Sequence, residues 1–287
     1  MQAAPTITLD SYELTLSPMT VEDVPLLHEL SIGVSWPHRP KDWELLIDLG
    51  EGFVARDPIG RILGSAMWFP MGDRLATIGM VITSPRLQDH GAGRWLMHHI
   101  LDLVGSRGKV LHATKAAFRL YLSLAFEPRQ ILYQHQGIVT ALPDGPSSAR
   151  PLRKEDVGAV IALDAAAYGA DRTAVFERIL PDSEGTVIER AGQVRGFALC
   201  REFGRGHVIG PVVGETEHDA VALIRPHVAA LKGRFLRMDT RAEEGPLRRF
   251  LDAAGMPLFD TDTTMTRDEV PPPGHMTTYG LVNQSLG

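Results

Sequence analysis

The stretch MVITSPRLQDHGAGRWL, residues 80–96, passes from an apolar run through a polar turn into a segment of helical periodicity. The residues LATIGMVI (75–82) have the composition of a strand, and the apolar positions 92, 96, 100 and 103 recur on one helical stripe. A turn that opens a helix presents unpaired N–H groups and the positive end of the helix dipole, which together bind anions. Gly91 and Gly93 let the backbone approach an anion closely. We therefore expect a phosphate-binding turn here.

Two better-known phosphate loops are excluded by the residues around this turn. A P-loop requires Gly-Lys followed by Ser or Thr at the start of the helix, whereas Gly93 is followed by Arg94 and Trp95. A dinucleotide fingerprint requires a third small residue at position 96, which is leucine, and a parallel strand-helix-strand unit. The strands upstream of the turn are expected to be antiparallel, so neither loop fits.

Helical and strand patterns alternate on both sides of the turn. A helix that Thr20 can cap and two strands joined at DPIG (57–60) precede the apolar strand. A strand at VLHA (110–113), a short helix at FRLYLSLAF (118–126) and a strand at ILYQHQ (131–136) follow it. This order predicts an α+β fold with a mixed, mostly antiparallel sheet flanked by helices.

The chain repeats itself at a nearly constant offset. LSPMTVEDV (16–24) is similar to ARPLRKEDV (149–157), GRILGSAM (60–67) to GQVRGFAL (192–199), and TIGMVI (77–82) to VIGPVV (208–213). The three pairs keep their order, and their offsets are 133, 132 and 131 residues. We therefore expect two domains of one fold, 1–140 and 151–287, joined by a linker at 141–150 that is rich in Pro, Gly and Ser. TTYGLVNQSLG (277–287) is expected to add a final strand.

Composition limits the compartment and the partners. The chain has 287 residues, a net charge of −6 and a single cysteine, Cys200, which cannot form an internal disulfide. Its start has no basic segment followed by an apolar one, so we expect a cytoplasmic protein. No apolar run approaches the roughly 20 residues that span a bilayer, and neither half is basic, so neither a membrane nor a nucleic acid is expected as a partner. No Cys/His cluster has the spacing of a metal site, and monomer and homodimer both stay open.

The opening stretch resembles the central motif of the GNAT superfamily of N-acetyltransferases. In that motif a strand is followed by V-x-P and then by (Q/R)-x-x-G-x-(G/A) at the start of a helix, with Pro85 as the proline here. LHATKAAFRLYLSLAF (111–126) is similar to the family's next strand-to-helix segment, in the family's order and spacing. The resemblance covers residues 12–140 and, more weakly, 148–270. It implies two tandem GNAT-like acyl-CoA N-acyltransferase domains.

The resemblance implies acetyl-CoA as the acetyl donor. Its pantetheine arm would pair with the backbone near Ile82 and Thr83. Tyr121 matches the family's usual proton donor, which would protonate the departing thiolate. The pyrophosphate would lie on the loop residues Gln88, Asp89, His90, Gly91, Ala92, Gly93 and Arg94.

Three residues depart from the family pattern. Asp89, Ala117 and Ala125 stand where glycine is usual. Alanine is tolerated where φ is negative. A carboxylate beside a pyrophosphate weakens binding unless it points away, so we expect Asp89 to face solvent or to cap the helix.

The second copy lacks the glycine turn. About four residues are missing there relative to the first copy, and VVGETEHDAVALI (212–224) offers EHD in its place. Acidic residues without Gly-x-Gly bind anions poorly, so we expect no CoA in this domain. It would act as a structural partner, as a wall of the acceptor pocket, or as both.

Residues for the acceptor and the base are less sharply indicated. Trp36, His38 and Trp43 lie in SIGVSWPHRPKDWELL (31–46), which joins the first two helices, and they are candidates to line a pocket for an amine or to anchor a loop. The candidates for the general base are His38, His112 and His135. His112 is the first choice, because its strand precedes the Tyr121 helix.

The sequence thus predicts an acetyl-CoA-dependent N-acetyltransferase that transfers the acetyl group directly to a small-molecule primary amine, with Tyr121 as general acid and without a metal. Two alternatives stay open. One is a catalytically silent acyl-CoA-binding or ligand-sensing module, and the other is a protein or peptide N-acetyltransferase. The amine and the preferred acyl chain are not determined by the sequence.

Overall fold

The computed structural model of the protein describes residues 4–9, 12–87, 90–272, 274 and 276–287. The first copy comprises β1 (Thr6–Leu9), β2 (Tyr12–Pro18), η1 (Val21–Asp23), α1 (Val24–Gly33), α2 (Pro40–Leu49), β3 (Glu51–Arg56), β4 (Ile62–Met71), β5 (Leu75–Thr83), η2 (Pro85–Leu87), α3 (Ala92–Val104), β6 (Gly108–Ala113), α4 (Phe118–Ser123) and β7 (Glu127–Ile138). The second comprises β8 (Ala149–Pro151), η3 (Lys154–Asp156), α5 (Val157–Tyr168), α6 (Thr173–Ile179), η4 (Leu180–Asp182), β9 (Ser183–Arg190), β10 (Gln193–Phe203), β11 (Gly206–Gly214), α7 (Glu217–Ala230), β12 (Phe235–Thr240), α8 (Pro246–Ala254), β13 (Leu258–Arg267) and β14 (Thr277–Gly280).

The order of elements repeats from β2 in the first copy and from β8 in the second. In each copy an antiparallel meander ends on a strand that pairs in parallel with the next one, β5 with β6 and β11 with β12. The predicted α+β fold with two copies of a mixed sheet is therefore confirmed. The segment 141–148 between the copies has no helix or strand. The first two residues of β8, 149 and 150, fall within the expected linker 141–150.

Helix α3 follows the predicted apolar stripe with one change. Ala92, Leu96 and Ile100 are buried against the sheet, whereas Leu103 is exposed and Val104 takes its place in the core. The buried positions 92, 96, 100 and 104 are four residues apart, so at 3.6 residues per turn the buried stripe rotates by about 40° with each step and leaves Leu103 outside it. The helix thereby packs on β4 and β5 and fixes its N-terminus at the end of β5.

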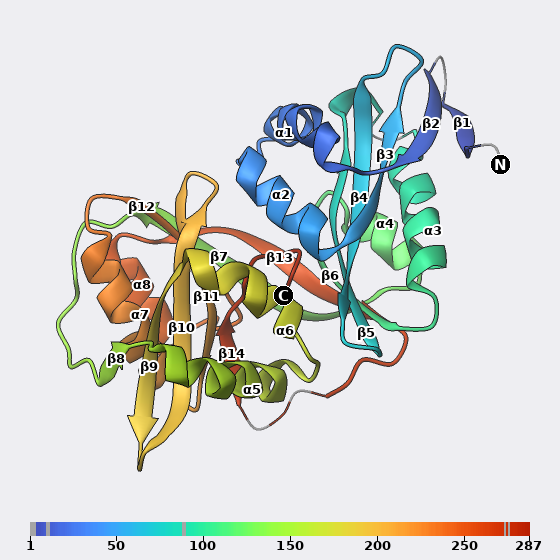
Figure 1. Ribbon diagram of the computed structural model, residues 1–287. Helices are drawn as coiled ribbons and strands as arrows, with labels where there is room; N and C mark the ends of the chain where they lie inside the picture. Colours follow the sequence, from blue (N-terminus) through green and yellow to red (C-terminus); the bar gives the residue numbers. More distant parts are fainter. Residues whose placement is uncertain (1–3, 10–11, 88–89, 273, 275) are drawn as a thin grey trace.

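The last strands of the two copies are exchanged. The order across the sheet is β5-β6-β13-β7-β12-β11, so β13 of the second copy lies between β6 and β7 of the first. Strand β7 in turn pairs with β12 of the second copy. Figure 1 shows the green β7 and the orange-red β13 side by side between the two halves. One continuous sheet therefore runs through both copies.

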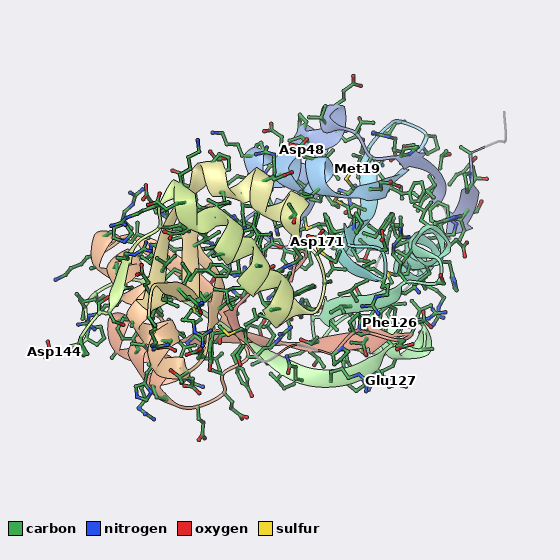
Figure 2. All side chains as sticks on the ribbon, turned by 60° about the horizontal axis from the view of Figure 1, so that its bottom comes forward. Met19, Asp48, Phe126, Glu127, Asp144 and Asp171 are labelled. Carbon is green, nitrogen blue, oxygen red and sulfur yellow. The ribbon has the colours of Figure 1, made fainter. Side chains whose placement is uncertain are left out.

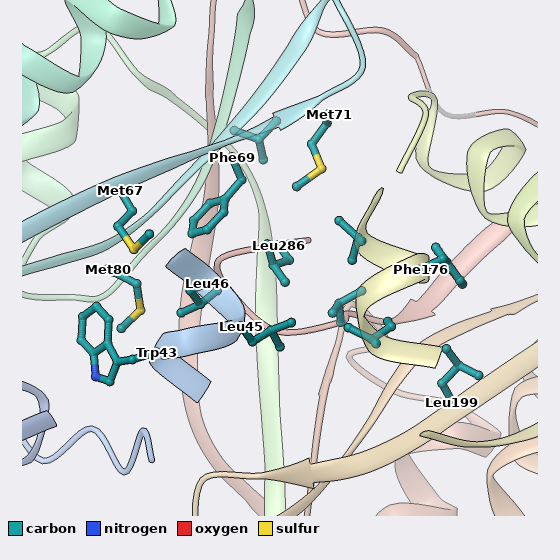
Figure 3. Close-up of a cluster of buried hydrophobic side chains, with 14 of the residues drawn as sticks. Trp43, Leu45, Leu46, Met67, Phe69, Met71, Met80, Phe176, Leu199 and Leu286 are labelled. Carbon is teal, nitrogen blue, oxygen red and sulfur yellow. The ribbon is translucent and has the colours of Figure 1, made fainter. Parts of the chain in front are cut away.

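Strand β7 carries the chain from one half to the other. Figure 2 shows Glu127, where β7 begins, and Asp144, in the segment after its end, on opposite sides of the molecule. A hydrophobic core is also shared between the copies. It includes Trp43 and Leu46 of α2, Phe176 of α6 and Leu286 near the C-terminus, as Figure 3 shows. Backbone pairing and apolar packing thus both join the two copies.

No helix within the described ranges is long and apolar enough to cross a membrane.

Candidate active site

Strand β5 contains a β-bulge close to its C-terminal end. Met67 of β4 pairs with Gly79 and Ser65 pairs with Ile82, so Met80 and Val81 together face a single residue of β4. Met80 has a φ of +52°, and its carbonyl accepts a 2.8 Å hydrogen bond from Ser65 Oγ. A bulge bends its strand and turns backbone groups out of the ladder.

Beyond the bulge, β5 and β6 separate. They pair only from Leu75 with Gly108 to Ile78 with Leu111, although both strands continue further. Val81 lies on the edge of β5 that β6 has left and lines the cavity described below. Ile82 pairs with β4, and its side chain is buried. By strand alternation the backbone of Val81, rather than that of Ile82, faces the open edge. Beside Val81 the edge of β5 is therefore not paired with β6.

The glycine turn forms the N-terminus of α3. Gly91 is the N-cap residue in the left-handed region, with φ +89°, and a Cβ placed on it would meet no atom within 4 Å. No described side chain caps the helix. Gly93 packs against Leu120, whose Cδ2 would lie 3.2 Å from an added Cβ, and Arg94 donates a 2.6 Å hydrogen bond to Ser123 Oγ.

These features fit a pyrophosphate, because the turn is open to solvent and its N–H groups end a helix dipole. His90, Gly91 and Arg94 are exposed, while Ala92 is buried beneath the turn. The predicted ligands Gln88 and Asp89 lie outside the described residues, as does the expected orientation of Asp89.

A cavity of about 320 Å³ lies beside the open edge of β5. Its floor is formed by four adjacent strands, β6, β13, β7 and β12, which come alternately from the two copies. Its walls are the loop between α1 and α2, the turn between β10 and β11, and the C-terminal segment. The residues that line it are Val34–His38, Ile78–Val81, His112, Thr114, Ala117, Tyr121, Gln134, Gln136, Phe203, Arg205, Arg237, Phe259, Asp260, Asp262 and Asn283–Ser285.

Tyr121 reaches this cavity from α4. The Phe126 N–H closes the helix by donating to the Tyr121 carbonyl at 3.1 Å, and the two rings meet edge to face at 6.0 Å. Burial raises the pKa of Tyr121 above its ordinary value, so the phenol keeps its proton at neutral pH. Among the described residues, none forms a hydrogen bond to its hydroxyl. The proton is therefore available to a group bound in the cavity.

His112 also lines the cavity, but its basicity is low. Its Nδ1 lies 3.1 Å from Thr264 Oγ1, and its buried Nε2 has no hydrogen-bond partner among the described residues. Burial lowers its pKa from 6.5 to about 3, and the nearby Arg241 charge adds to the shift. Such an imidazole is neutral at pH 7 and holds an added proton weakly. Its surroundings therefore favour hydrogen bonding over general-base catalysis.

Of the three acceptor-binding candidates in segment 31–46, two line the cavity. Trp36 and His38 line the cavity, with ring centroids 6.0 Å apart, and Phe203 of the second copy meets His38 edge to face at 5.4 Å. Burial lowers the pKa of His38 to about 4. The assignment of Trp43 to acceptor binding is wrong, because its side chain is fully buried in the core and its Nε1 faces Ser31.

His135 does not reach the cavity and is therefore not positioned to act as the base. It lies fully buried in β7, where its Nδ1 is 2.9 Å from the Met256 carbonyl, and it does not line the cavity. Its strand was identified correctly, but alternation turns His135 to the face of the sheet opposite Gln134 and Gln136. This histidine packs at the seam between the copies.

The second copy was expected as a possible wall of the acceptor pocket, but the sequence did not indicate which of its residues line the cavity floor. Asp262 accepts a 2.7 Å hydrogen bond from Gln284 Nε2, and Asp260 pairs with Lys115 at 2.9 Å. Burial raises the pKa of Asp262 from 3.8 to about 6. Only the exchange of β13, a contact between residues about 150 positions apart, brings these carboxylates to His112. No local pattern encodes such a contact.

The second copy lacks the corresponding site. Helix α7 is capped by its own Thr216, whose side chain accepts from the Asp219 N–H at 3.1 Å, and Asp219 pairs with Arg190. Helix α8 closes as α4 does, with the Met256 N–H donating to the Leu251 carbonyl at 2.9 Å. Leu251 therefore stands where Tyr121 stands in the first copy. The glycine N-cap of α3 and the phenol of α4 are thus both replaced in the second copy.

Known proteins share both the sequence pattern and the fold. The pattern of the acetyltransferase (GNAT) family matches residues 22–126, and that of an acetyltransferase (GNAT) domain matches residues 160–280. An uncharacterized N-acetyltransferase, YitH of Bacillus subtilis, is 26% identical over 260 residues, which cover 88% of this chain and 91% of that protein.

Two solved structures have the same fold over nearly their whole length. A putative acetyltransferase from Pyrococcus horikoshii superimposes with a TM-score of 0.81 at 15% identity, covering 96% of both chains. A tandem GNAT protein from the clavulanic acid biosynthesis pathway superimposes with a TM-score of 0.65 at 14% identity, covering 90% of this chain and 99% of that one. Within the described residues, no group of three or more His, Cys, Asp or Glu side chains is placed to hold a metal ion.

Proposed function

Because the chain belongs to the GNAT superfamily of N-acetyltransferases and carries two of its domains in tandem, we propose that its first domain transfers an acetyl group from acetyl-CoA to a primary amine of a small molecule. One observation carries the proposal. Tyr121 and the open edge of β5 line one cavity of about 320 Å³, and β5 leads from this cavity to the glycine turn at the start of α3.

The residues present suit each requirement of direct transfer. The N–H groups at the start of α3 would hold the pyrophosphate, and the Val81 backbone would pair with the pantetheine arm. The thioester supplies an activated acetyl group. Backbone N–H groups turned outward by the bulge would stabilise the oxyanion that forms on its carbonyl. Tyr121 would donate its proton to the departing thiolate.

The size and enclosure of the cavity favour a small acceptor over a protein. A volume of about 320 Å³ is at the lower end of small-molecule sites. Phe203, Arg205 and Asn283–Ser285 of the second domain add to its walls. A protein chain would need an open groove here, so the peptide alternative has less support.

The test is the release of CoA thiol across a panel of primary amines. We expect at least one amine to be acetylated and Tyr121→Phe to lower kcat by about 10²- to 10⁴-fold, with acetyl-CoA binding unchanged. Leu122→Ala, on the exposed side of the same helix, serves as the control and should keep wild-type kinetics. Slow thioester hydrolysis without turnover of any amine would instead support a silent acyl-CoA-binding module.

A further inference from the structure

Asp262 lies on the floor of the cavity. In β13 it pairs with Leu132 of β7 and directly precedes Thr263, which pairs with Ala113 of β6. Alternation puts it on the same face as Thr264, whose hydroxyl touches His112. Only 7% of its surface is exposed. A side chain supplied by the second domain therefore faces the same space as Tyr121.

Asp262 differs from the other buried aspartates in its partners. Eight aspartates in the described ranges are buried, and seven of them form an ion pair with an arginine: Asp23, Asp42, Asp57, Asp156, Asp164, Asp219 and Asp239. Asp262 has only the amide of Gln284 within hydrogen-bond distance among the described residues. A buried carboxylate is costly unless it is paired, so the protein maintains an uncompensated charge at this point.

The neighbouring charges do not neutralise Asp262. Arg237 of β12 is engaged with Asp239 at 2.8 Å, and Lys115 is engaged with Asp260. Burial raises the pKa of Asp262 most, and the negative charges of Asp239 and Asp260 add to the rise, whereas the Gln284 hydrogen bond and the Arg237 charge lower it. His112 on the adjoining strand is neutral at pH 7. Arg205 also lines the cavity, but among the described residues no cation lies within ion-pair distance of Asp262.

We propose that Asp262 binds the ammonium group of the acceptor and takes a proton from it, an assignment that rests on the proposed acetyltransferase function. The ligand class is then a primary amine that is cationic in solution. Its charge supplies the missing partner of Asp262, and the rings of Trp36 and His38 border the same space.

Asp262 and Tyr121 together account for every proton in the proposed transfer. Asp262 takes one proton from the ammonium, which frees the nitrogen lone pair to attack the acetyl carbonyl. The C–N bond forms and the C–S bond breaks. Tyr121 protonates the thiolate and regains a proton from the acceptor nitrogen, and Asp262 releases its proton to solvent. An ammonium and acetyl-CoA become an amide, CoA thiol and one proton.

The exchange of strands gives this assignment a structural consequence. Tyr121 and the phosphate turn belong to the first domain, whereas Asp262 belongs to the second. The acceptor site is therefore incomplete without the second domain, even though that domain has no CoA turn of its own.

The test compares Asp262→Asn with Asp57→Asn in the full chain. Asp57 is buried to the same extent, with 7% exposure, but pairs with Arg61 in a turn away from the cavity. We expect Asp262→Asn to bind acetyl-CoA as the wild type does and to lose about 100-fold in kcat/KM for the best amine of the panel. Asp57→Asn should lower stability and leave kcat/KM unchanged.

The pH profile separates catalysis from a structural role. For the wild type, kcat/KM should rise with pH to a plateau above about 6, where Asp262 is ionised, and this limb should vanish in Asp262→Asn. A rise that continues to the pKa of the amine itself would overturn the assignment, because the enzyme would then take the neutral amine from solution.

The two proposals fail in different ways. If the wild type acetylates an amine and Asp262→Asn does so equally well, the Asp262 assignment alone is overturned. A different result would contradict the proposed function itself: the wild type binds acetyl-CoA, but it acetylates no amine of the panel and no amine raises its Tm. The role of Asp262 would then be contradicted as well.

Discussion

At the scale of single residues, burial reverses the ranking of bases that the sequence gives. His112 was preferred for its ordinary pKa and its place before the Tyr121 helix. The cavity lowers the pKa of the His112 imidazole to about 3 and raises the pKa of the Asp262 carboxyl to about 6. Desolvation opposes the charged form of each group, so it weakens a histidine base and strengthens a carboxylate base. This difference supports the proposed role of Asp262 as proton acceptor over one for His112.

Asp262→Asn should stabilise the protein at neutral and higher pH. The folded-state pKa of Asp262 is raised, so ionisation costs stability as pH rises from about 4 to about 6. The amide carries no such cost and is expected to raise the free energy of unfolding by on the order of 2 kcal/mol at pH 8. Denaturant unfolding at pH 8 and at pH 4 would measure this. A variant that is less stable than the wild type at both pH values would indicate a structural carboxylate.

Ala125→Gly should also stabilise the protein. Glycine is usual at this position in the family, and Ala125 takes a φ of +61°, where a Cβ is strained. The equivalent Gly255 of the second domain has a φ of +94°. We expect a gain of about 1 kcal/mol in the free energy of unfolding. Ala117→Gly is the matched control, because its φ is −88° and the change should destabilise. Equal effects of the two variants would contradict this.

At the scale of elements, periodicity located most helices and strands but not their contacts. The glycine turn, the apolar stripe of α3 and the Tyr121 helix were all indicated by residues close in sequence. The exchange of β13 was not, because pairing with β6 or with β7 satisfies the same alternation. The carboxylates of the cavity floor and the Asn283–Ser285 wall were missed for the same reason. Trp43 was a candidate to line a pocket or to anchor its segment, and helix α2 buries it in the core.

The contact of the C-terminal segment with β5 is a test at this scale. A Cβ on Gly79 would lie 2.4 Å from Ser285 Oγ and 3.0 Å from Ser285 Cα, and Thr77 Oγ1 donates to the Ser285 carbonyl at 2.6 Å. Gly79→Ala should push this wall away, cost roughly 1–3 kcal/mol of stability and raise KM for the amine. Gly33→Ala, where an added Cβ meets no atom within 4 Å, should do neither. An unchanged KM in Gly79→Ala would show that the segment does not shape the acceptor site.

At the scale of the whole molecule, the exchange makes the two domains depend on each other. Separation of the copies would leave edges of β6, β7 and β12 unpaired and would open the shared core. The domains are therefore expected to unfold in one transition rather than two.

Separately expressed halves test this dependence. Residues 1–145 and 146–287 divide the chain in an exposed segment without helix or strand. Each half alone should be insoluble or should lack a cooperative unfolding transition, whereas co-expression should yield a stable complex. A half that folds cooperatively by itself would contradict the exchange.

The most direct test of the proposed function is a calorimetric titration of acetyl-CoA into the wild type and two variants. Gly91→Glu places a carboxylate at the phosphate turn. Gly60→Glu matches it, since Gly60 has nearly the same φ of +88° and equally open space, but lies in the turn between β3 and β4. We predict one site per chain in the wild type and in Gly60→Glu, and none in Gly91→Glu. A second site of similar affinity, or a wild type that binds no acetyl-CoA, would contradict a single cofactor site at the start of α3.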